Sequence, residues 1–271
     1  MKVEEVKEIT SKALDELVTA LESGHSETLT TYLKTMSLFS KYSLNNLFLI
    51  ARQRPDARRV AGFHTWRKLG RYVRKGEKGI AIIAPLVRRK SDKESEQSDK
   101  ERVIAGFKVA HIFSEQQTEG QPLPELGTVI GDPSAYFERL TKYIAEQNIV
   151  LEYSDEIVPA KGTATRGKIT LLPGQTPGEL LATLAHETAH ALMHFSERRS
   201  ETTKRIRETE AEAVAFVVCN AIGLETGTSS ADYIGLYAGD AKLLTESLEY
   251  VQQIANRILT AIVPENSATP T

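Results

Sequence analysis

Hydrophobic positions in the first part of the chain recur every three or four residues, which is the spacing of one buried face of a helix. Three such runs predict three helices, over about 3–21, from about 26, and from about 43 to just before Pro55. The spacing changes after Pro55. Residues 79–85 and 103–109 are short apolar runs that predict two strands, and the polar stretch 88–102 between them is typical of a hairpin tip.

Composition indicates where one domain ends and another begins. Residues 114–132 are rich in Gln, Gly and Pro, which is typical of a linker. A helix from about 133 to 147 follows, and a short strand at 167–172 precedes a long apolar run. We therefore expect an α+β protein of two domains. Residues 1–125 form the domain with the hairpin, and residues 133–263 form a mainly helical domain with a small sheet.

The long apolar run contains His186-Glu187-Thr188-Ala189-His190, in which the two histidines are four residues apart. A helix turns once per 3.6 residues, so both imidazoles lie on one face and can bind the same ion, with Glu187 beside them. Thr176 and Glu179 match the capping box that begins such a helix. A Glu buried between two histidines is costly unless a cation compensates it, which favours a zinc site over a helix with stray histidines.

A catalytic zinc site usually has three protein ligands. His194 continues the spacing, but it lies about 12 Å from His186 along a straight helix, which is too far for both to bind one ion. We expect it to support a ligand, to contact the substrate or simply to lie on the helix face. The better candidates are acids on a second apolar helix, with Glu208 as the ligand and Glu212 as the carboxylate that orients a ligand histidine. Glu210 lies about 200° around that helix and points elsewhere.

Two alternatives remain for these acids: Glu212 as the direct ligand, or a solvated helix N-terminus. These acids follow the second histidine in the sequence at a spacing that resembles the zincin metallopeptidases. That resemblance implies that the strand at 167–172 lies at a sheet edge and pairs with an extended peptide. It also implies that Glu187 takes the proton of a zinc-activated water. For the oxyanion the sequence leaves three candidates open, which are His194, Tyr233 and Tyr237.

Charge is distributed unevenly along the 271 residues, although the formal net charge is only −2. Between Ser40 and Lys90 there are fourteen Lys or Arg against two acids, which suggests a polyanion-binding domain joined to an acidic one. The single cysteine, Cys219, cannot form an internal disulfide. The N-terminus lacks the apolar core of a signal peptide and no stretch approaches a membrane span, so we expect a cytoplasmic protein.

Aromatic residues alternate with cations in this basic segment. Such a mixture suits single-stranded nucleic acid, because phosphates bind the cations and unstacked bases stack on the rings. The candidate DNA-binding residues are Arg52, Arg54, Arg58, Arg59, Trp66, Arg67, Lys68, Arg71, Tyr72, Arg74, Lys75 and Lys78. The alternative is a solvated basic hairpin in which Trp66 and Phe63 belong to the core.

A series of short motifs resembles ArdC-type antirestriction proteins over nearly the full length. They are Tyr42-Ser43-Leu44-Asn45-Asn46, Gln53-Arg54-Pro55, residues 60–66, 70–80 and 117–120, the metal helix, and residues 210–216 and 233–237. The resemblance implies a single-stranded-DNA-binding domain joined to a zincin-like metallopeptidase domain that acts on a protein substrate. Such proteins are carried by plasmids and protect incoming DNA from host restriction.

Two alternatives to this function remain. The first is a cytoplasmic zinc metalloprotease whose basic domain recruits a protein or RNA partner. The second is a purely structural zinc module, in which the DNA-binding domain carries all of the function. Glu187 argues against the second alternative, because a structural site needs no general base.

Overall fold

The computed structural model describes residues 2–89, 102–123, 133–224 and 239–263. The chain divides into two compact units, and the described residues 2–15 and 48–121 belong to the first, the N-terminal unit. Residues 16–47 group with those from 122 onward in the second, the C-terminal unit. The α+β class is confirmed. The domain limits 1–125 and 133–263 stay a prediction, and the two divisions differ chiefly at residues 16–47.

Three helices form where the spacing of apolar residues predicts them. They are α1 (Val3–Glu22), α2 (Glu27–Leu38) and α3 (Leu44–Gln53). The start of α1 and the end of α3 belong to the N-terminal unit, where Val6 and Leu49 pack with Ala81 in a buried cluster. The Gln53 carboxamide donates to the Ala81 carbonyl and accepts from the Ala81 amide, each at 2.9 Å, which fixes the end of α3 to a strand.

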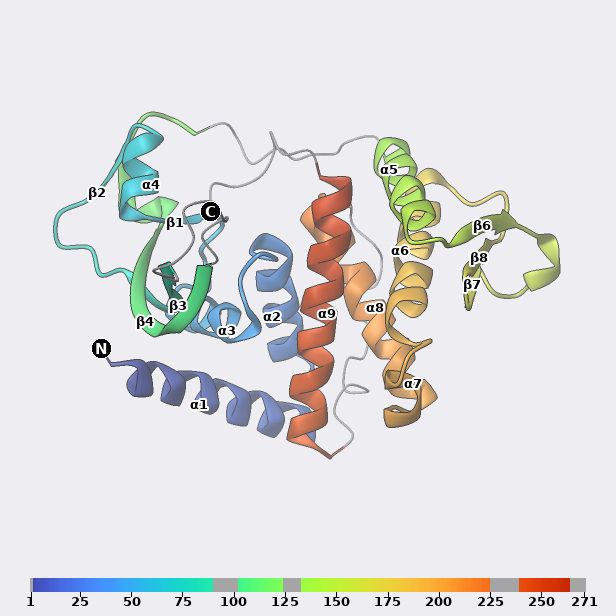
Figure 1. Ribbon diagram of the computed structural model, residues 1–271, viewed down its shortest axis with the longest axis horizontal. Helices are drawn as coiled ribbons and strands as arrows, with labels where there is room; N and C mark the ends of the chain where they lie inside the picture. Colours follow the sequence, from blue (N-terminus) through green and yellow to red (C-terminus); the bar gives the residue numbers. More distant parts are fainter. Residues whose placement is uncertain (1, 90–101, 124–132, 225–238, 264–271) are drawn as a thin grey trace, which may run out of the picture. The chain divides into compact units, whose positions relative to one another are not determined.

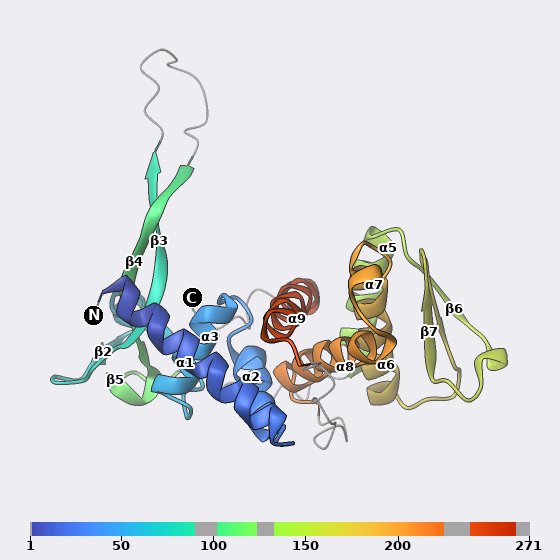
Figure 2. The same ribbon diagram turned by 90° about the horizontal axis from the view of Figure 1, so that it is seen from below.

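Most of the N-terminal unit is β-structure. An antiparallel sheet has the order β1 (Val60–Gly62), β4 (Arg102–Ser114), β3 (Ile80–Arg89), and β3 and β4 run together as a long ribbon (Figure 2). The short helix α4 (Phe63–Lys68) follows β1, and β2 (Arg71–Val73) pairs with β5 (Thr118–Gly120). Both predicted strands are confirmed and are longer than expected. Of the expected tip at 88–102, residues 88, 89 and 102 belong to the strands, and residues 90–101 lie outside the described residues.

The sequence prediction placed the start of the linker too early. Ser114 ends β4, a 3-10 turn covers Glu115–Gln117, and β5 follows directly. Gln117 is buried, and its carboxamide accepts from the Ser114 amide and donates to the Lys78 carbonyl. Polar composition suggested a loop here, but these side chains are hydrogen-bonded inside the N-terminal unit. Of the expected linker, residues 124–132 lie outside the described residues.

The C-terminal unit is mainly helical. Its further elements are α5 (Pro133–Glu146), β6 (Val150–Tyr153), a 3-10 turn at Asp155–Ile157, β7 (Gly162–Thr165), β8 (Lys168–Leu171), α6 (Pro177–Met193), α7 (Arg198–Glu201), α8 (Lys204–Ala221) and α9 (Ala241–Ile262). Helix α6 is central, because it packs against α5, α8, α9 and the sheet (Figure 1). Helix α2 packs on α8 within the same unit. No described helix is both long and apolar enough to cross a membrane.

Helix α6 begins as the sequence predicts. The Thr176 hydroxyl accepts from the amide of Glu179, and the Glu179 carboxylate accepts from the amide of Thr176, which completes a capping box with Pro177 in the first turn. Lys161 also binds Glu179 at 2.8 Å. These contacts hold the pKa of Glu179 at about 2, chiefly through the hydrogen bond from Lys161. The start of the helix, and therefore the register of its histidines, is well determined.

The small sheet differs from the expectation. Its order is β6-β8-β7, with β6 and β8 parallel and β7 and β8 antiparallel. The strand directly before the metal helix, β8, is therefore central, and the prediction that it is an edge strand is wrong. The edge strand that contacts α6 is β7. Strand β6 pairs in parallel with the side of β8 that the sequence prediction left free for a peptide.

Candidate metal centre

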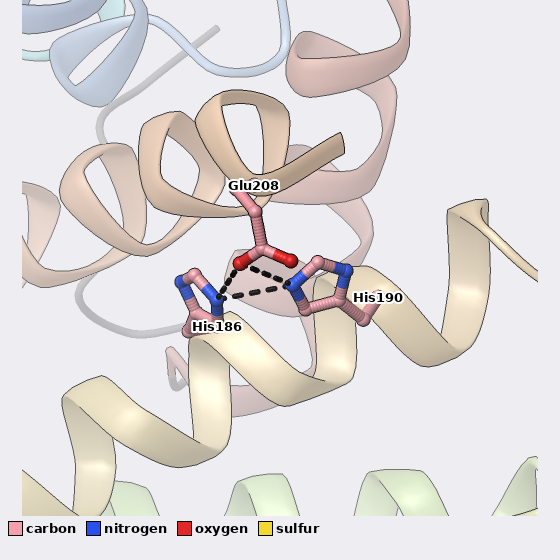
Figure 3. A group of neighbouring side chains, drawn as sticks. All are labelled: His186, His190 and Glu208. Atoms are coloured by element: carbon pink, nitrogen blue, oxygen red, sulfur yellow. Dashed lines mark hydrogen bonds and ion pairs between the residues drawn. The ribbon is translucent and has the colours of Figure 1, made fainter. Parts of the chain in front are cut away.

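Three side chains with metal-binding atoms converge between α6 and α8. His186 and His190 lie one turn apart on α6, and Glu208 reaches them from the second turn of α8 (Figure 3). The two Nε2 atoms are 3.1 Å apart. Oε2 of Glu208 lies 3.7 Å from Nε2 of His186 and 3.5 Å from Nε2 of His190.

These separations fit one metal ion. Ligand atoms held tetrahedrally at bond lengths near 2.1 Å are about 3.4 Å from one another. The three observed distances lie on both sides of that value, and no larger movement than a few tenths of an ångström is needed. Two imidazoles and one carboxylate form a donor set that suits zinc and other divalent transition metals. The residues therefore fit a divalent cation.

The rings of the two histidines have different surroundings. Nδ1 of His186 lies 3.3 Å from Oε2 of Glu212, on the side of the ring away from Glu208. Burial would lower the pKa of His186, but the carboxylates of Glu208 and Glu212 outweigh it and raise the pKa to about 9. His190 has less negative charge nearby, so burial and the other two histidines lower its pKa to about 4.

Glu187 points into the same site from α6. It is 6% exposed, and burial raises its pKa to about 7, which is the range of a general base at neutral pH. A side chain at Gly162 of β7 would collide with it, because a Cβ there would lie 2.8 Å from Cγ of Glu187. The backbone of the edge strand thus approaches the carboxylate as closely as glycine permits.

An open pocket of about 640 Å³ contains this constellation. His186, Glu187, Glu208 and Glu212 line it together with apolar side chains such as Phe216. Two candidates for the oxyanion, Tyr233 and Tyr237, lie outside the described residues. The third, His194, is buried and both of its ring nitrogens contact other side chains, so it does not serve that purpose in this structure.

Glu210 points away from Glu208, as the helical geometry predicts. The structure adds what the sequence did not indicate: Glu210 is fully buried and contacts His194 and Arg198. Burial alone would raise the pKa of Glu210, but hydrogen bonds from His194, Arg198 and Ser247 outweigh it and hold the pKa below its usual range.

Several candidate DNA-binding residues have structural roles. Trp66 is fully buried and donates its indole N–H to the Phe113 carbonyl, so it offers no surface to a base and the stacking prediction is wrong for it. Arg59 is buried beside Glu115. The Arg71 guanidinium donates to the side chain and carbonyl of Thr118 and to the Gln121 carbonyl, and so joins β2 to β5.

Other candidates lie on the surface of the N-terminal unit. The exposed or half-exposed cations are Arg52, Arg54, Arg58, Arg67, Lys68, Arg74, Lys75 and Lys78. Arg54 and Arg74 both pair with Glu77, at 3.6 and 2.8 Å. Tyr72 on β2 is 55% exposed, and Phe63 at the start of α4 is also exposed, although the sequence argument did not select it. These two rings, and not Trp66, are accessible to a base.

Comparison with known proteins identifies the N-terminal part. Residues 5–113 match the family ArdcN, the N-terminal domain of anti-restriction factor ArdC. The chain carries an ArdcN domain. The match covers α1 to nearly the end of β4 and includes the exposed cations and Tyr72.

Solved structures extend the likeness beyond the matched domain. The metal-free crystal structure of the antirestriction ArdC protein from plasmid R388 is 20% identical, with a TM-score of 0.52, over 93% of this chain and 97% of that one. Its Mn(II)-bound structure is 19% identical, with a TM-score of 0.54, over 94% and 98%. At identities this low the likeness shows a shared fold, which extends over nearly the whole chain.

A curated relative of this chain is the uncharacterized protein pXO2-81 of Bacillus anthracis. It is 25% identical over 93% of this chain and 50% of its own length. The chain thus spans about half the length of the curated relative that it matches.

Proposed function

We propose that this protein binds single-stranded DNA with its N-terminal unit and a divalent metal ion, zinc, with its C-terminal unit, and that it protects DNA from restriction. The observation that carries the metal site is the convergence of three donor atoms from α6 and α8 at tetrahedral spacing. The ArdcN match supports the antirestriction role. The two parts of the proposal rest on different units and can be tested separately.

DNA binding rests on the exposed part of the basic segment. Lys75 and Lys78 are exposed next to the β2–β5 pair, and Tyr72 projects from the same pair. Phosphates can bind the cations while an unstacked base lies on the phenol ring, which a stacked duplex does not permit. This arrangement favours single-stranded over duplex DNA.

In the proposed metal site, His186 and His190 bind through Nε2 and Glu208 through a carboxylate oxygen. Glu212 contacts Nδ1 of His186 and orients that ring. The R388 protein binds Mn(II) in its crystal structure, which supports a divalent ion in this fold. We assign zinc because two imidazoles and one carboxylate leave an open fourth position, as in hydrolytic zinc sites.

The same pocket supports peptide hydrolysis. A bound zinc ion supplies Lewis acidity toward oxygen ligands. Glu187, with its carboxylate beside the ligands and its pKa raised to about 7, accepts a proton from the attacking water. The β7 edge approaches Glu187 at Gly162, which places an extended peptide within reach if it pairs with that edge.

The test uses the full chain, because residues 16–47, which the expected boundary assigns to the first domain, group with the C-terminal unit. A cut at the expected boundary would remove them from that unit. Transfer of an unmodified plasmid into a restricting host is compared for the parent, Glu187→Gln and a Lys75→Glu/Lys78→Glu variant. Lys142→Glu, an exposed cation on α5, is the matched charge control. We expect the double charge reversal to abolish protection, and Lys142→Glu and Glu187→Gln to retain it.

Protection by DNA binding and cleavage of a host protein give different outcomes in this test. Protection without DNA binding would refute the proposed role of the basic surface. Loss of protection in Glu187→Gln with normal DNA binding would instead favour a metalloprotease that acts on a host protein. Full zinc content in a His186→Ala/His190→Ala protein, measured by elemental analysis, would refute the metal assignment.

A further inference from the structure

Behind the ligand histidine His190 lies a buried series of hydrogen-bonded side chains. His194, which caps the C-terminus of α6, has its Nδ1 2.8 Å from Nδ1 of His190. Its Nε2 lies 2.9 Å from Oε2 of Glu210 on α8. Both His194 and Glu210 are essentially inaccessible to water. A continuous path therefore runs from the metal-binding ring into the core of the C-terminal unit.

Hydrogen-bond chemistry gives this path one direction. An imidazole that binds a metal through Nε2 keeps its proton on Nδ1. His190 must then donate to Nδ1 of His194, and that nitrogen must be unprotonated, because two N–H groups cannot face each other at 2.8 Å. The proton of His194 is consequently on Nε2, from which it donates to the acceptor-only carboxylate of Glu210.

The far end of the path is anchored by Arg198 at the start of α7. Its Nη2 donates to Oε1 of Glu210 and, at 2.8 Å, to the hydroxyl of Ser247 on α9. Its guanidinium also lies over the ring of Tyr250, 4.6 Å from the centroid. A buried ion pair of this kind often stabilises a fold no better than apolar packing would, so its presence points to a positional role. Here it fixes the carboxylate that receives the His194 proton.

We propose that His194 is a positioning residue that holds His190 in the tautomer and orientation required for metal binding, with Glu210 and Arg198 as its support. The inference rests on the proposed metal site. The two ligand histidines would then be backed by the same helix, α8. Glu212 contacts His186 directly, whereas Glu210 acts on His190 through the imidazole of His194. Carboxylates that orient ligands in this way change metal affinity by about 10- to 100-fold.

The test measures binding of Co(II), and of Zn(II) by competition with a chromophoric chelator, to the full chain at constant pH. His194→Leu removes the acceptor for His190 at similar volume. His194→Asn keeps an acceptor, because its carbonyl oxygen can take the place of Nδ1. His111→Leu, at an exposed histidine of the N-terminal unit, is the matched control.

We expect His194→Leu to weaken Co(II) binding by about 10- to 100-fold and to shift the visible Co(II) bands, which report the ligand field. His194→Asn should recover most of the affinity, and His111→Leu should match the parent. Parent-like affinity and spectrum in His194→Leu would overturn the positioning role while the metal site stands. A parent protein that binds neither ion would instead refute the metal site itself, and the inference with it.

A second measurement needs no variant. In the zinc-loaded parent, nitrogen-15 shifts of the imidazoles distinguish a protonated from an unprotonated ring nitrogen. The proton of His190 should be on Nδ1 and that of His194 on Nε2. A proton on Nδ1 of His194 would break the series at its first hydrogen bond and overturn the proposal, whether or not the variants fold.

Discussion

Replacing Glu208 and Glu212 one at a time distinguishes a metal ligand from the residue that orients one. The two acids lie one turn apart on α8 and both line the pocket. Oε2 of Glu208 faces the Nε2 atoms of both histidines, whereas Oε2 of Glu212 faces only Nδ1 of His186. A metal ion at the centre of the three donors would contact Glu208 and not Glu212.

The geometry sets the size of the two effects. A unit charge 4 Å from another contributes about 4 kcal/mol at an effective dielectric constant near 20, which is nearly three powers of ten in affinity. Glu208 would lie closer to a doubly charged ion, but its side chain is 52% exposed and water screens it. We therefore expect Glu208→Ala to weaken zinc binding by about 1,000-fold. Glu212→Ala should weaken it by about 10- to 100-fold, the usual effect of an orienting carboxylate.

Competition with a chromophoric chelator measures both constants on the full chain. Glu249→Ala, which removes an exposed acid of α9 outside the pocket, controls for the loss of negative charge. Thermal unfolding of each metal-free variant controls for folding. The reverse order of affinities would transfer the ligand role to Glu212, and equal small losses would mean that neither acid binds the ion.

Four further predictions concern the same protein. Glu187→Gln should keep its metal content and its affinity for single-stranded DNA, and lose peptidase activity by several powers of ten in a peptide-cleavage assay. Gly162→Ala should also lower cleavage with unchanged metal content, because the added Cβ would lie 2.8 Å from Cγ of Glu187. Tyr72→Ala should weaken single-stranded DNA binding by about 1–3 kcal/mol in fluorescence anisotropy and leave duplex binding unchanged. Zinc affinity should rise with pH up to about 9, because His186 has a pKa of about 9 in the metal-free protein and must lose its proton to bind. Calorimetry in buffers of different ionisation enthalpy at pH 7.5 should detect that released proton, and pH-independent affinity would contradict this reasoning.

The metal helix could be predicted from the sequence because its information is local. The capping box at Thr176 fixes where α6 starts, and helical periodicity then places His186 and His190 on one face. The same periodicity places Glu208 and Glu212 together on α8. What periodicity could not supply was the rotation of α8 relative to α6, which depends on packing between residues far apart in the sequence.

The basic segment was harder to interpret because composition does not separate surface from core. Trp66 and Arg71 stand among cations in the sequence, yet one is buried and the other joins β2 to β5. Both roles depend on residues near 113–121, about 50 positions away, most of which the sequence argument assigned to a linker. The alternative that placed Phe63 in the core with Trp66 is wrong for Phe63, which begins α4 with its ring exposed.

Three acids at alternate positions of α8 lie on two opposite faces of the helix. Successive residues are about 100° apart, so positions 208 and 212 nearly coincide in direction while 210 is on the opposite side. The sequence therefore predicted that Glu210 points away from the ion. The structure adds that its carboxylate contacts the His194 imidazole. A solvated helix N-terminus has no need for a buried acid paired with a buried arginine. The burial of Glu210 and Arg198 thus shows that this face of α8 is packed against His194 at the end of α6 and not exposed to solvent.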